Sequence, residues 1–257
     1  MRIPTFLLDE VMLAARERAI ARRHEILRAR PPATTDWSDD LPWAKSLYLR
    51  AESWKFVDLF PELAPGELSD AAHGVWSPNG KYVYRKHILP AHTELIIMRG
   101  GQKGVVSFDG DVVLPALFEG PVRRDWAPWM SLTPMEIQTL RAGTRLARGH
   151  VVVTGLGLGH QLAGVCARRQ VERVTLVEIS AELVDWLLPR IREAYGITRE
   201  IDVVIGSAER EVPKLTADIA LLDHFAQYGN NGWERDWFAR RTPGITRWWA
   251  WGAGRVG

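Results

Sequence analysis

The second half of the chain alternates short apolar runs with longer segments in which apolar residues recur every three or four positions. The apolar runs predict strands at residues 151–154, 173–177, 201–205 and 218–222. The amphipathic segments predict helices at 134–147, 161–169 and 181–195, with a further helix at 232–241 and a strand at 246–251. Strands and helices that alternate at this spacing form parallel sheets with right-handed crossovers. We therefore expect an α/β fold with a doubly wound, mostly parallel sheet.

The first of these helices has three start signals. Thr133 is a favoured N-cap residue, Pro134 suits the first helical position, and Glu136 completes a Thr-x-x-Glu capping box. We expect the helix to end near Gly149. The start signals divide the chain into an N-terminal helical and β-rich region, 1–130, and an α/β domain, 131–257.

Residues 73–119 have a different pattern, in which short β-rich runs are separated by turn residues. The runs lie at 81–84, 94–98, 104–108 and 112–114. The pair Asp109-Gly110 lies between two of these runs and is a hairpin signal. We expect a small antiparallel sheet here.

The first thirty residues predict an amphipathic helix that is rich in arginine and ends at Pro31-Pro32. Glu10, Glu17 and Glu25 dilute its positive charge, so we interpret it as a packing helix with a solvated arginine face. A helix that binds nucleic acid or an anionic membrane is the alternative. From Pro31 to residue 70 we expect irregular connections with short helices.

Composition narrows the class of protein. The chain has 257 residues, of which 46% are hydrophobic, and a net charge of +2. No apolar stretch approaches the ~18 to 20 residues that a membrane span requires. The lone Cys166 cannot form an internal disulfide, which indicates a reducing, cytoplasmic environment.

Tryptophan is unusually frequent, and its distribution follows the predicted organisation. There are 12 tryptophans, and between residues 130 and 232 only Trp186 occurs. The tryptophans therefore flank the predicted α/β core, where Val, Ile and Leu suit tightly packed parallel strands. We interpret the flanking rings as sealing a small sheet against the preceding region, with a stacking surface for an acceptor or a subunit contact as alternatives.

The most informative motif is the glycine-rich turn Gly155-Leu156-Gly157-Leu158-Gly159, which joins a predicted strand to a predicted helix. Glycines let such a turn bend tightly and let a ligand approach the backbone. Glu178 ends the next strand, where a carboxylate can accept hydrogen bonds from both hydroxyls of a ribose. This order of elements indicates a nucleoside-type ligand. The glycine spacing differs from the G-x-G-x-x-G of dinucleotide-binding proteins, which disfavours an NAD-dependent oxidoreductase.

On these motifs, residues 131–228 resemble the Rossmann-type, class I S-adenosylmethionine-dependent methyltransferase superfamily. The resemblance implies that the glycine turn, Glu178 and its neighbour Ile179 bind S-adenosylmethionine. It also implies contacts near the adenine from Ser207 and Ala208, which follow the third strand. The equivalent position after the fourth strand is Asp223.

Three features depart from the usual pattern of that superfamily, and one of them is Ser207, which replaces the aspartate commonly found beside adenine. Val153 stands two residues before the first glycine, where many methyltransferases have an acid. The aminopropyltransferases, the spermidine synthase group, share this apolar residue and also place a small β-rich domain before the Rossmann core. The residues after Asp223 leave room for one helix and one strand, so we expect the sheet to be C-terminally shortened, or completed or covered at its edge by strands from 73–119.

The candidate catalytic residues lie at the carboxyl ends of the strands, where open α/β sheets bind their ligands. Asp223 and His224 follow the fourth strand, and Tyr228 lies in the next loop. His224 is a candidate general base, and Asp223 is a candidate for holding an amine of the cofactor or of an acceptor. Glu136 either caps its helix or faces the methionine portion of the cofactor. No histidine or cysteine cluster has metal-ligand spacing, so we expect no metal.

These features predict an enzyme, an S-adenosylmethionine-dependent methyltransferase that acts on a small-molecule acceptor. No Pro-Pro motif follows Asp223, as amino-directed DNA methylation would require, and Cys166 is misplaced for cytosine C5 methylation. The charge balance gives no indication of nucleic-acid binding. Two alternatives stay open: aminopropyl transfer from decarboxylated S-adenosylmethionine, which the few carboxylates after Leu222 disfavour, and a non-catalytic S-adenosylmethionine-binding or assembly protein. A homo-oligomer is compatible with each of them.

Overall fold

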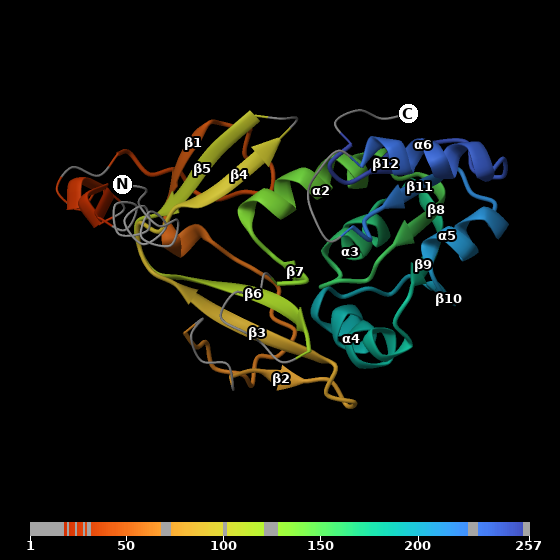
Figure 1. Cartoon of the computed structure of the whole chain (residues 1–257), viewed down its shortest axis with the longest axis horizontal. Helices are drawn as coiled ribbons and strands as arrows, with labels where there is room; N and C mark the ends of the chain where they lie inside the picture. Colours follow the sequence, from red (N-terminus) through yellow and green to blue (C-terminus); the bar gives the residue numbers. More distant parts are fainter. Residues whose placement is uncertain are drawn as a thin grey trace, which may run out of the picture.

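The computed structural model describes residues 18–19, 21–23, 25–27, 29, 32–67, 73–99, 102–120, 128–225 and 231–253. The described residues from 18 to 29 are helical, and the rest of the predicted N-terminal helix lies outside the described residues. Figure 1 shows a β-rich N-terminal part beside a C-terminal α/β part, with α2 (Pro134–Leu146) between them. In the part of the chain that the structure describes, no helix is long and apolar enough to cross a membrane.

The C-terminal part contains a five-stranded sheet in the order β10-β9-β8-β11-β12. Its strands are β8 (Gly149–Thr154), β9 (Val171–Glu178), β10 (Asp202–Ile205), β11 (Ile219–Leu222) and β12 (Trp248–Ala250). Every neighbouring pair is parallel, and the chain order of the strands reverses between β8 and β11. This sheet confirms the doubly wound, Rossmann-like fold. It ends at β12, and the described strands of the N-terminal part do not pair with it.

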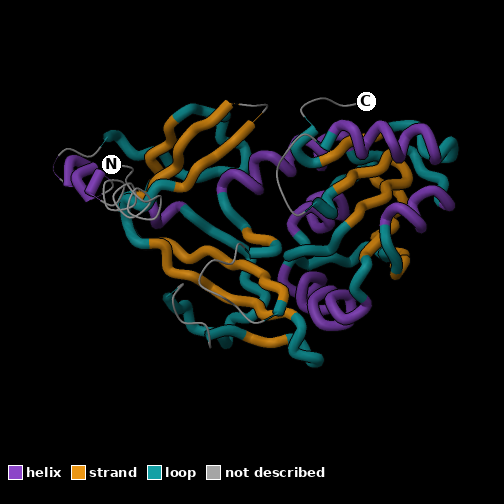
Figure 2. The backbone as a smooth tube through the Cα atoms, viewed as in Figure 1, coloured by secondary structure: helices purple, strands orange, loops and turns teal. Residues whose placement is uncertain are grey.

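Helices cover both faces of this sheet (Figure 2). One face packs against α2, α3 (His160–Cys166) and α4 (Ala181–Ala194), and the other against α5 (Ala208–Glu211), η2 (Val212–Lys214) and α6 (Gly232–Arg241). In β8 the buried side chains of Val151 and Val153 belong to the first layer, whereas Val152 belongs to the second. A strand that is apolar at consecutive positions is therefore explained by burial on both faces.

The N-terminal part contains two small sheets, where the sequence predicts one. The first has the order β1-β5-β4, with β1 (Ser46–Leu49), β5 (Gln102–Phe108) and β4 (Leu95–Arg99). The second has the order β2-β3-β6-β7, with β2 (Val75–Trp76), β3 (Tyr82–Leu89), β6 (Val112–Glu119) and β7 (Met130–Ser131). β1 pairs with β5 in parallel, so the expectation of a single antiparallel sheet is wrong. A short helix, η1 (Ala51–Ser53), follows β1.

The prediction of a hairpin at Asp109-Gly110 is also wrong, because β5 and β6 belong to different sheets. Asp109 is bound to the segment after β1 instead. Its carboxylate accepts the backbone N–H of Ala51 at 2.7 Å, and its own N–H donates to the carbonyl of Leu49 at 3.0 Å. The antiparallel neighbour of β5 is β4. The turn residues therefore form a crossing between two sheets.

Tryptophans near the end of the chain seal the parallel sheet against α2. The ring of Trp249 lies against the Cα of Gly143, so that any side chain at position 143 would meet it. The indole N–H of Trp251 donates to the hydroxyl of Thr139 at 2.9 Å. Both tryptophans contact α2, which belongs to the α/β part, so these contacts do not test the inferred seal against the preceding region.

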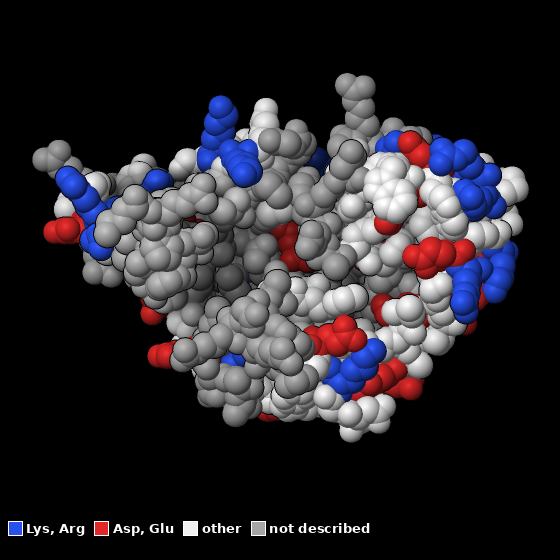
Figure 3. Space-filling model, viewed as in Figure 1, with Lys and Arg blue, Asp and Glu red and all other residues white. Residues whose placement is uncertain are grey.

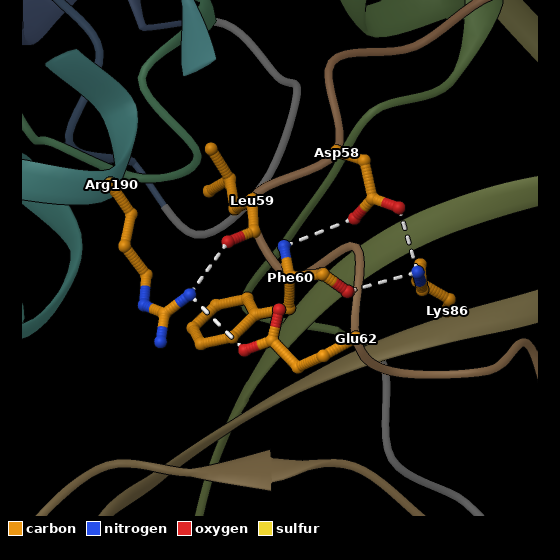
Figure 4. A network of polar contacts seen from close by, with 6 residues as sticks. All are labelled: Asp58, Leu59, Phe60, Glu62, Lys86 and Arg190. Atoms are coloured by element: carbon orange, nitrogen blue, oxygen red, sulfur yellow. Dashed lines mark hydrogen bonds and ion pairs between the residues drawn. The ribbon is translucent and has the colours of Figure 1, made fainter. Parts of the chain in front are cut away.

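A polar network ties the N-terminal part to α4 (Figure 4). Lys86 on β3 is 3% exposed, and its ammonium group donates to Asp58 at 2.7 Å and to the carbonyl of Phe60 at 3.0 Å. From α4, Arg190 donates to the carbonyl of Leu59 at 3.2 Å and lies 4.1 Å from the centre of the Phe60 ring. The segment 58–60 is thereby held from both sides, which fixes the N-terminal sheet against the α/β part.

Candidate active site at the carboxyl ends of the strands

A cavity of about 200 Å³ lies at the carboxyl ends of β8, β9, β10 and β11. It occupies the point where the order of the strands reverses, which is where open α/β sheets bind ligands. Its lining combines residues predicted from the sequence with others that were not. The lining residues are Trp129, Met130, Gly155, Gly157, Val177, Glu178, Ile179, Gly206, Ser207, Ala208, Glu209, Asp223, His224 and Phe225.

The glycine turn presents backbone to this cavity. Gly155 has a φ of 82°, and a Cβ there would collide with the carbonyl oxygen of Asp223. Leu156 and Leu158 have buried side chains that pack into the core. The two leucines therefore contribute backbone N–H groups at the site, and Gly159 caps the start of α3 in the left-handed conformation.

Glu178 is held rigidly at the end of β9. The residue is 6% exposed and lines the cavity. One carboxylate oxygen accepts the N–H of Leu156 at 2.7 Å, and the other accepts the N–H of Ser180 at 2.9 Å. A carboxylate oxygen can accept more than one hydrogen bond, so both oxygens keep acceptor capacity for a ligand. The glycine turn and the acid are thus joined into one preorganised unit.

The predicted adenine-side residues lie on the β10 side of Glu178. Ile179 is 68% exposed at the cavity. Ser207 and Ala208 line it from the start of α5, and the Ser207 hydroxyl makes no capping bond to that helix. This side therefore offers an apolar surface and a hydroxyl to a ring system.

His224 lines the opposite side of the cavity and is anchored by Thr154. Nδ1 of His224 lies 2.6 Å from Oγ1 of Thr154, which already accepts the N–H of Asp223 at 3.1 Å. Thr154 is fully buried, and among the described residues Nδ1 is the acceptor for its hydroxyl proton. This arrangement favours the neutral tautomer of His224 with its proton on Nε2, because Nδ1 can then accept the hydroxyl proton of Thr154.

Burial also fixes the charge state of His224. It lowers the pKa of the imidazole to about 4, so the ring is neutral at physiological pH. Its Nε2 is buried without a hydrogen-bond partner among the described residues. The geometry thus favours His224 as a hydrogen-bond donor toward a ligand over the general base considered from the sequence.

Asp223 and Glu136 form a pair of carboxyl groups beside the glycine turn. Burial and the nearby Glu136 carboxyl raise the pKa of Asp223 well above its usual value. Burial raises the pKa of Glu136 to about 8. The Glu136 carboxylate accepts the hydroxyl of Ser131 at 3.0 Å, while Thr133 caps the helix through the N–H of Glu136 at 3.3 Å. Only half of the predicted capping box therefore forms, through Thr133, and the Glu136 carboxyl is bound to Ser131.

Some predicted residues lie outside the described part of the chain, and some site residues were not predicted. Tyr228, the third catalytic candidate, falls within 226–230, which the structure does not describe. The unpredicted lining residues are Trp129, Met130, Val177, Gly206, Glu209 and Phe225. The excess of tryptophan near residue 129 was the one sequence signal for this group. Met130 carries no local signal, because it reaches the cavity from the N-terminal sheet.

No family model and no curated protein matches the sequence. Among solved structures, a precorrin 8w decarboxylase from Methanobacterium thermoautotrophicum is 20% identical, with 46% of this chain and 63% of that chain covered and a TM-score of 0.35. A methyltransferase from Podospora anserina with bound S-adenosylhomocysteine is 12% identical, with 48% and 53% covered and a TM-score of 0.37. An O-methyltransferase from Bacillus cereus in complex with S-adenosylhomocysteine is 18% identical, with 46% and 56% covered and a TM-score of 0.33. The chain thus spans less than two thirds of the length of each of these structures.

The sheet and the cavity together define the class of fold. A glycine turn after the first parallel strand, an acid at the end of the second, and a cavity at the reversal of strand order lie together where doubly wound α/β folds bind their ligands. The five-stranded parallel sheet confirms the doubly wound, Rossmann-like fold that the sequence predicts.

Proposed function

We propose that the cavity binds S-adenosylmethionine and that the protein transfers the methyl group to a small-molecule acceptor. The observation that carries the proposal is Glu178, a buried carboxylate positioned by two backbone N–H groups at the end of β9. Such a carboxylate at this position suits the two hydroxyls of a ribose. The glycine turn fits the cofactor, because Gly155 and Gly157 line the cavity and add no side chains of their own.

Strand order gives the direction of the ligand within the cavity. With the ribose at Glu178, the ring system lies toward β10, beside Ile179 and Ser207. The 5′ substituent then runs the other way, over the end of β8 toward Asp223, because β8 and β11 follow β9 in the sheet. This orientation brings the reactive end of the ligand to the residues with perturbed pKa values.

When bound, S-adenosylmethionine supplies an electrophilic methyl group on a positively charged sulfur. The protein must then hold the acceptor and take up its proton. His224 donates a hydrogen bond from Nε2 and orients the acceptor. Asp223, whose pKa is raised, is a better proton acceptor in its ionised form than an ordinary aspartate. The rings of Trp129 and Phe225 border the same cavity and suit a flat, partly apolar acceptor.

The distribution of charged residues on the surface is consistent with a small-molecule acceptor. On the face shown in Figure 3, basic and acidic residues are interspersed over the C-terminal part, and the described residues there form no continuous basic surface. Phosphate backbones are bound by such surfaces. A small molecule that enters the cavity therefore fits better than a nucleic acid.

Aminopropyl transfer from decarboxylated S-adenosylmethionine is a second candidate, favoured by the carboxyl pair of Asp223 and Glu136. Two neighbouring carboxyl groups can bind a cationic amine and release the proton that they otherwise retain. The two activities differ in the donor they consume. Parallel assays with labelled S-adenosylmethionine and labelled decarboxylated S-adenosylmethionine, each with amine and hydroxyl acceptors, distinguish them.

Calorimetry with S-adenosylhomocysteine tests the cofactor assignment. Glu178→Ala removes the ribose acceptor and should weaken binding by about 2 to 4 kcal/mol, which is roughly 30-fold or more. Glu193→Ala, on the exposed side of α4, is the matched control and should bind as the wild type does. Thermal unfolding of both variants separates loss of the site from loss of the fold. The assignment is refuted if the wild type fails to bind S-adenosylhomocysteine, or if folded Glu178→Ala binds it with unchanged affinity.

A further inference from the structure

Met130 reaches the glycine turn from the N-terminal sheet. It lies on β7, where it pairs with Leu117 of β6 while Ser131 pairs with Ala116. The next residue, Leu132, donates its N–H to the carbonyl of Pro115 at 3.0 Å. The backbone of Met130 is therefore fixed by the sheet, and its side chain is the part that can move.

The thioether of Met130 occupies the space directly above Gly157. A Cβ at Gly157, which has a φ of 48°, would collide with the sulfur. The same sulfur lies 3.0 Å from the N–H of Leu158 and accepts its hydrogen bond. A thioether is a weak acceptor, so this N–H is poorly satisfied and would gain from a stronger acceptor.

This sulfur belongs to the lining of the cavity that the proposed ligand would enter. Both Met130 and Gly157 line the cavity that Glu178 borders. If the proposed function is correct, the 5′ substituent passes over the end of β8 on its way from Glu178 to Asp223. A short substituent stops before Gly157, whereas the amino-acid tail of S-adenosylmethionine needs the space that the thioether fills.

We propose that Met130 is a displaceable gate that selects the ligand by the length of its 5′ substituent. Nucleosides with a short substituent bind with the gate in place. Ligands with the amino-acid tail must push the thioether away from Gly157 and take over the N–H of Leu158. Methionine suits this task because its side chain is unbranched and adapts to several rotamers.

Two variants separate the gate from ordinary packing. Met130→Ala opens the space, and Met130→Leu keeps it filled with a branched, sulfur-free side chain. The probes are S-adenosylhomocysteine, which has the tail, and 5′-methylthioadenosine, which shares the nucleoside and has only a methylthio group. Isothermal titration gives the ratio of the two affinities for each protein, and the affinity for 5′-methylthioadenosine shows that the pocket is intact.

In Met130→Ala the affinity ratio should shift toward S-adenosylhomocysteine by on the order of ten-fold, because no side chain has to leave a favoured rotamer or give up a bond. Met130→Leu should not shift the ratio in that direction. If the ratio of the two affinities is unchanged in Met130→Ala, or if both affinities fall equally, the gate proposal is rejected. Met130 is then a packing residue. If the wild type binds neither ligand, the proposed function fails together with the gate, so the two failures are distinguishable.

Discussion

Replacing Glu136 by glutamine removes a buried ionisable group while keeping its shape. Glu136 is 8% exposed, and its carboxyl accepts a hydrogen bond from the Ser131 hydroxyl at 3.0 Å, which an amide oxygen can also accept. The substitution therefore removes the titration of the Glu136 carboxyl together with its coulombic effect on Asp223. The pKa of Glu136 makes the expected effect depend on pH.

The sign of the effect follows from the two states of the chain. Burial raises the pKa of Glu136 from 4.5 to about 8. Above the lower value the carboxyl ionises in the unfolded chain while it stays protonated in the folded one, so the folded state of the wild type loses stability as the pH rises toward the upper value. Each pH unit in this window contributes about 1.4 kcal/mol. Between roughly pH 5 and 7.5, the wild type should lose about 3 kcal/mol of unfolding free energy relative to Glu136→Gln.

Urea unfolding of both proteins at several pH values measures this difference. Glu172→Gln, at an exposed position of β9, is the matched control and should follow the wild type at every pH. The histidines whose pKa values are lowered by burial titrate in both proteins and cancel in the comparison. If the curves of unfolding free energy against pH run parallel for the wild type and Glu136→Gln, the raised pKa of the buried Glu136 carboxyl is refuted.

Two further predictions concern the contacts that hold the parts of the chain together. Lys86→Ala removes the buried ammonium bound to Asp58 and to the Phe60 carbonyl, and urea unfolding should show a loss of about 3 kcal/mol, since breaking a buried ion pair leaves polar groups without a partner. A loss below a few tenths of a kcal/mol would show that the network contributes little. Trp251→Phe keeps a ring beside α2 but loses the indole bond to Thr139, which should reduce the unfolding free energy by about 1 kcal/mol. An unchanged midpoint of urea unfolding would show that the hydrogen bond between Trp251 and Thr139 does not contribute to stability.

The elements of the α/β part were predictable because their signals are local. The N-cap at Thr133, the glycine turn and the apolar runs each act within a few residues, and the observed helices and strands follow them closely. The two N-terminal sheets were not predictable in this way. Asp109-Gly110 has the sequence of a hairpin, but its carboxylate is bound to Ala51, far away in the chain. β5 pairs with β1 and β4, so it belongs to a different sheet from β6.

The same contrast applies to the site. Glu178 and the glycine turn could be located from spacing, because a strand end and the turn before a helix fix where such groups lie. The tautomer of His224 depends on Thr154, which approaches it from a neighbouring strand. Met130 depends on a pairing between β6 and β7 that no local pattern encodes. Chemistry that depends on contacts between distant segments was visible only in the folded chain.

The contact between Met130 and Gly157 also limits how the sequence can change over evolution. A side chain at position 157 can be accommodated only if residue 130 becomes smaller or turns away. Met130 lies on β7 and Gly157 in the turn after β8, yet a substitution at one alters the fitness of substitutions at the other. Related sequences that retain this site should therefore show covariation between a strand of the β-rich part and the middle glycine of the turn.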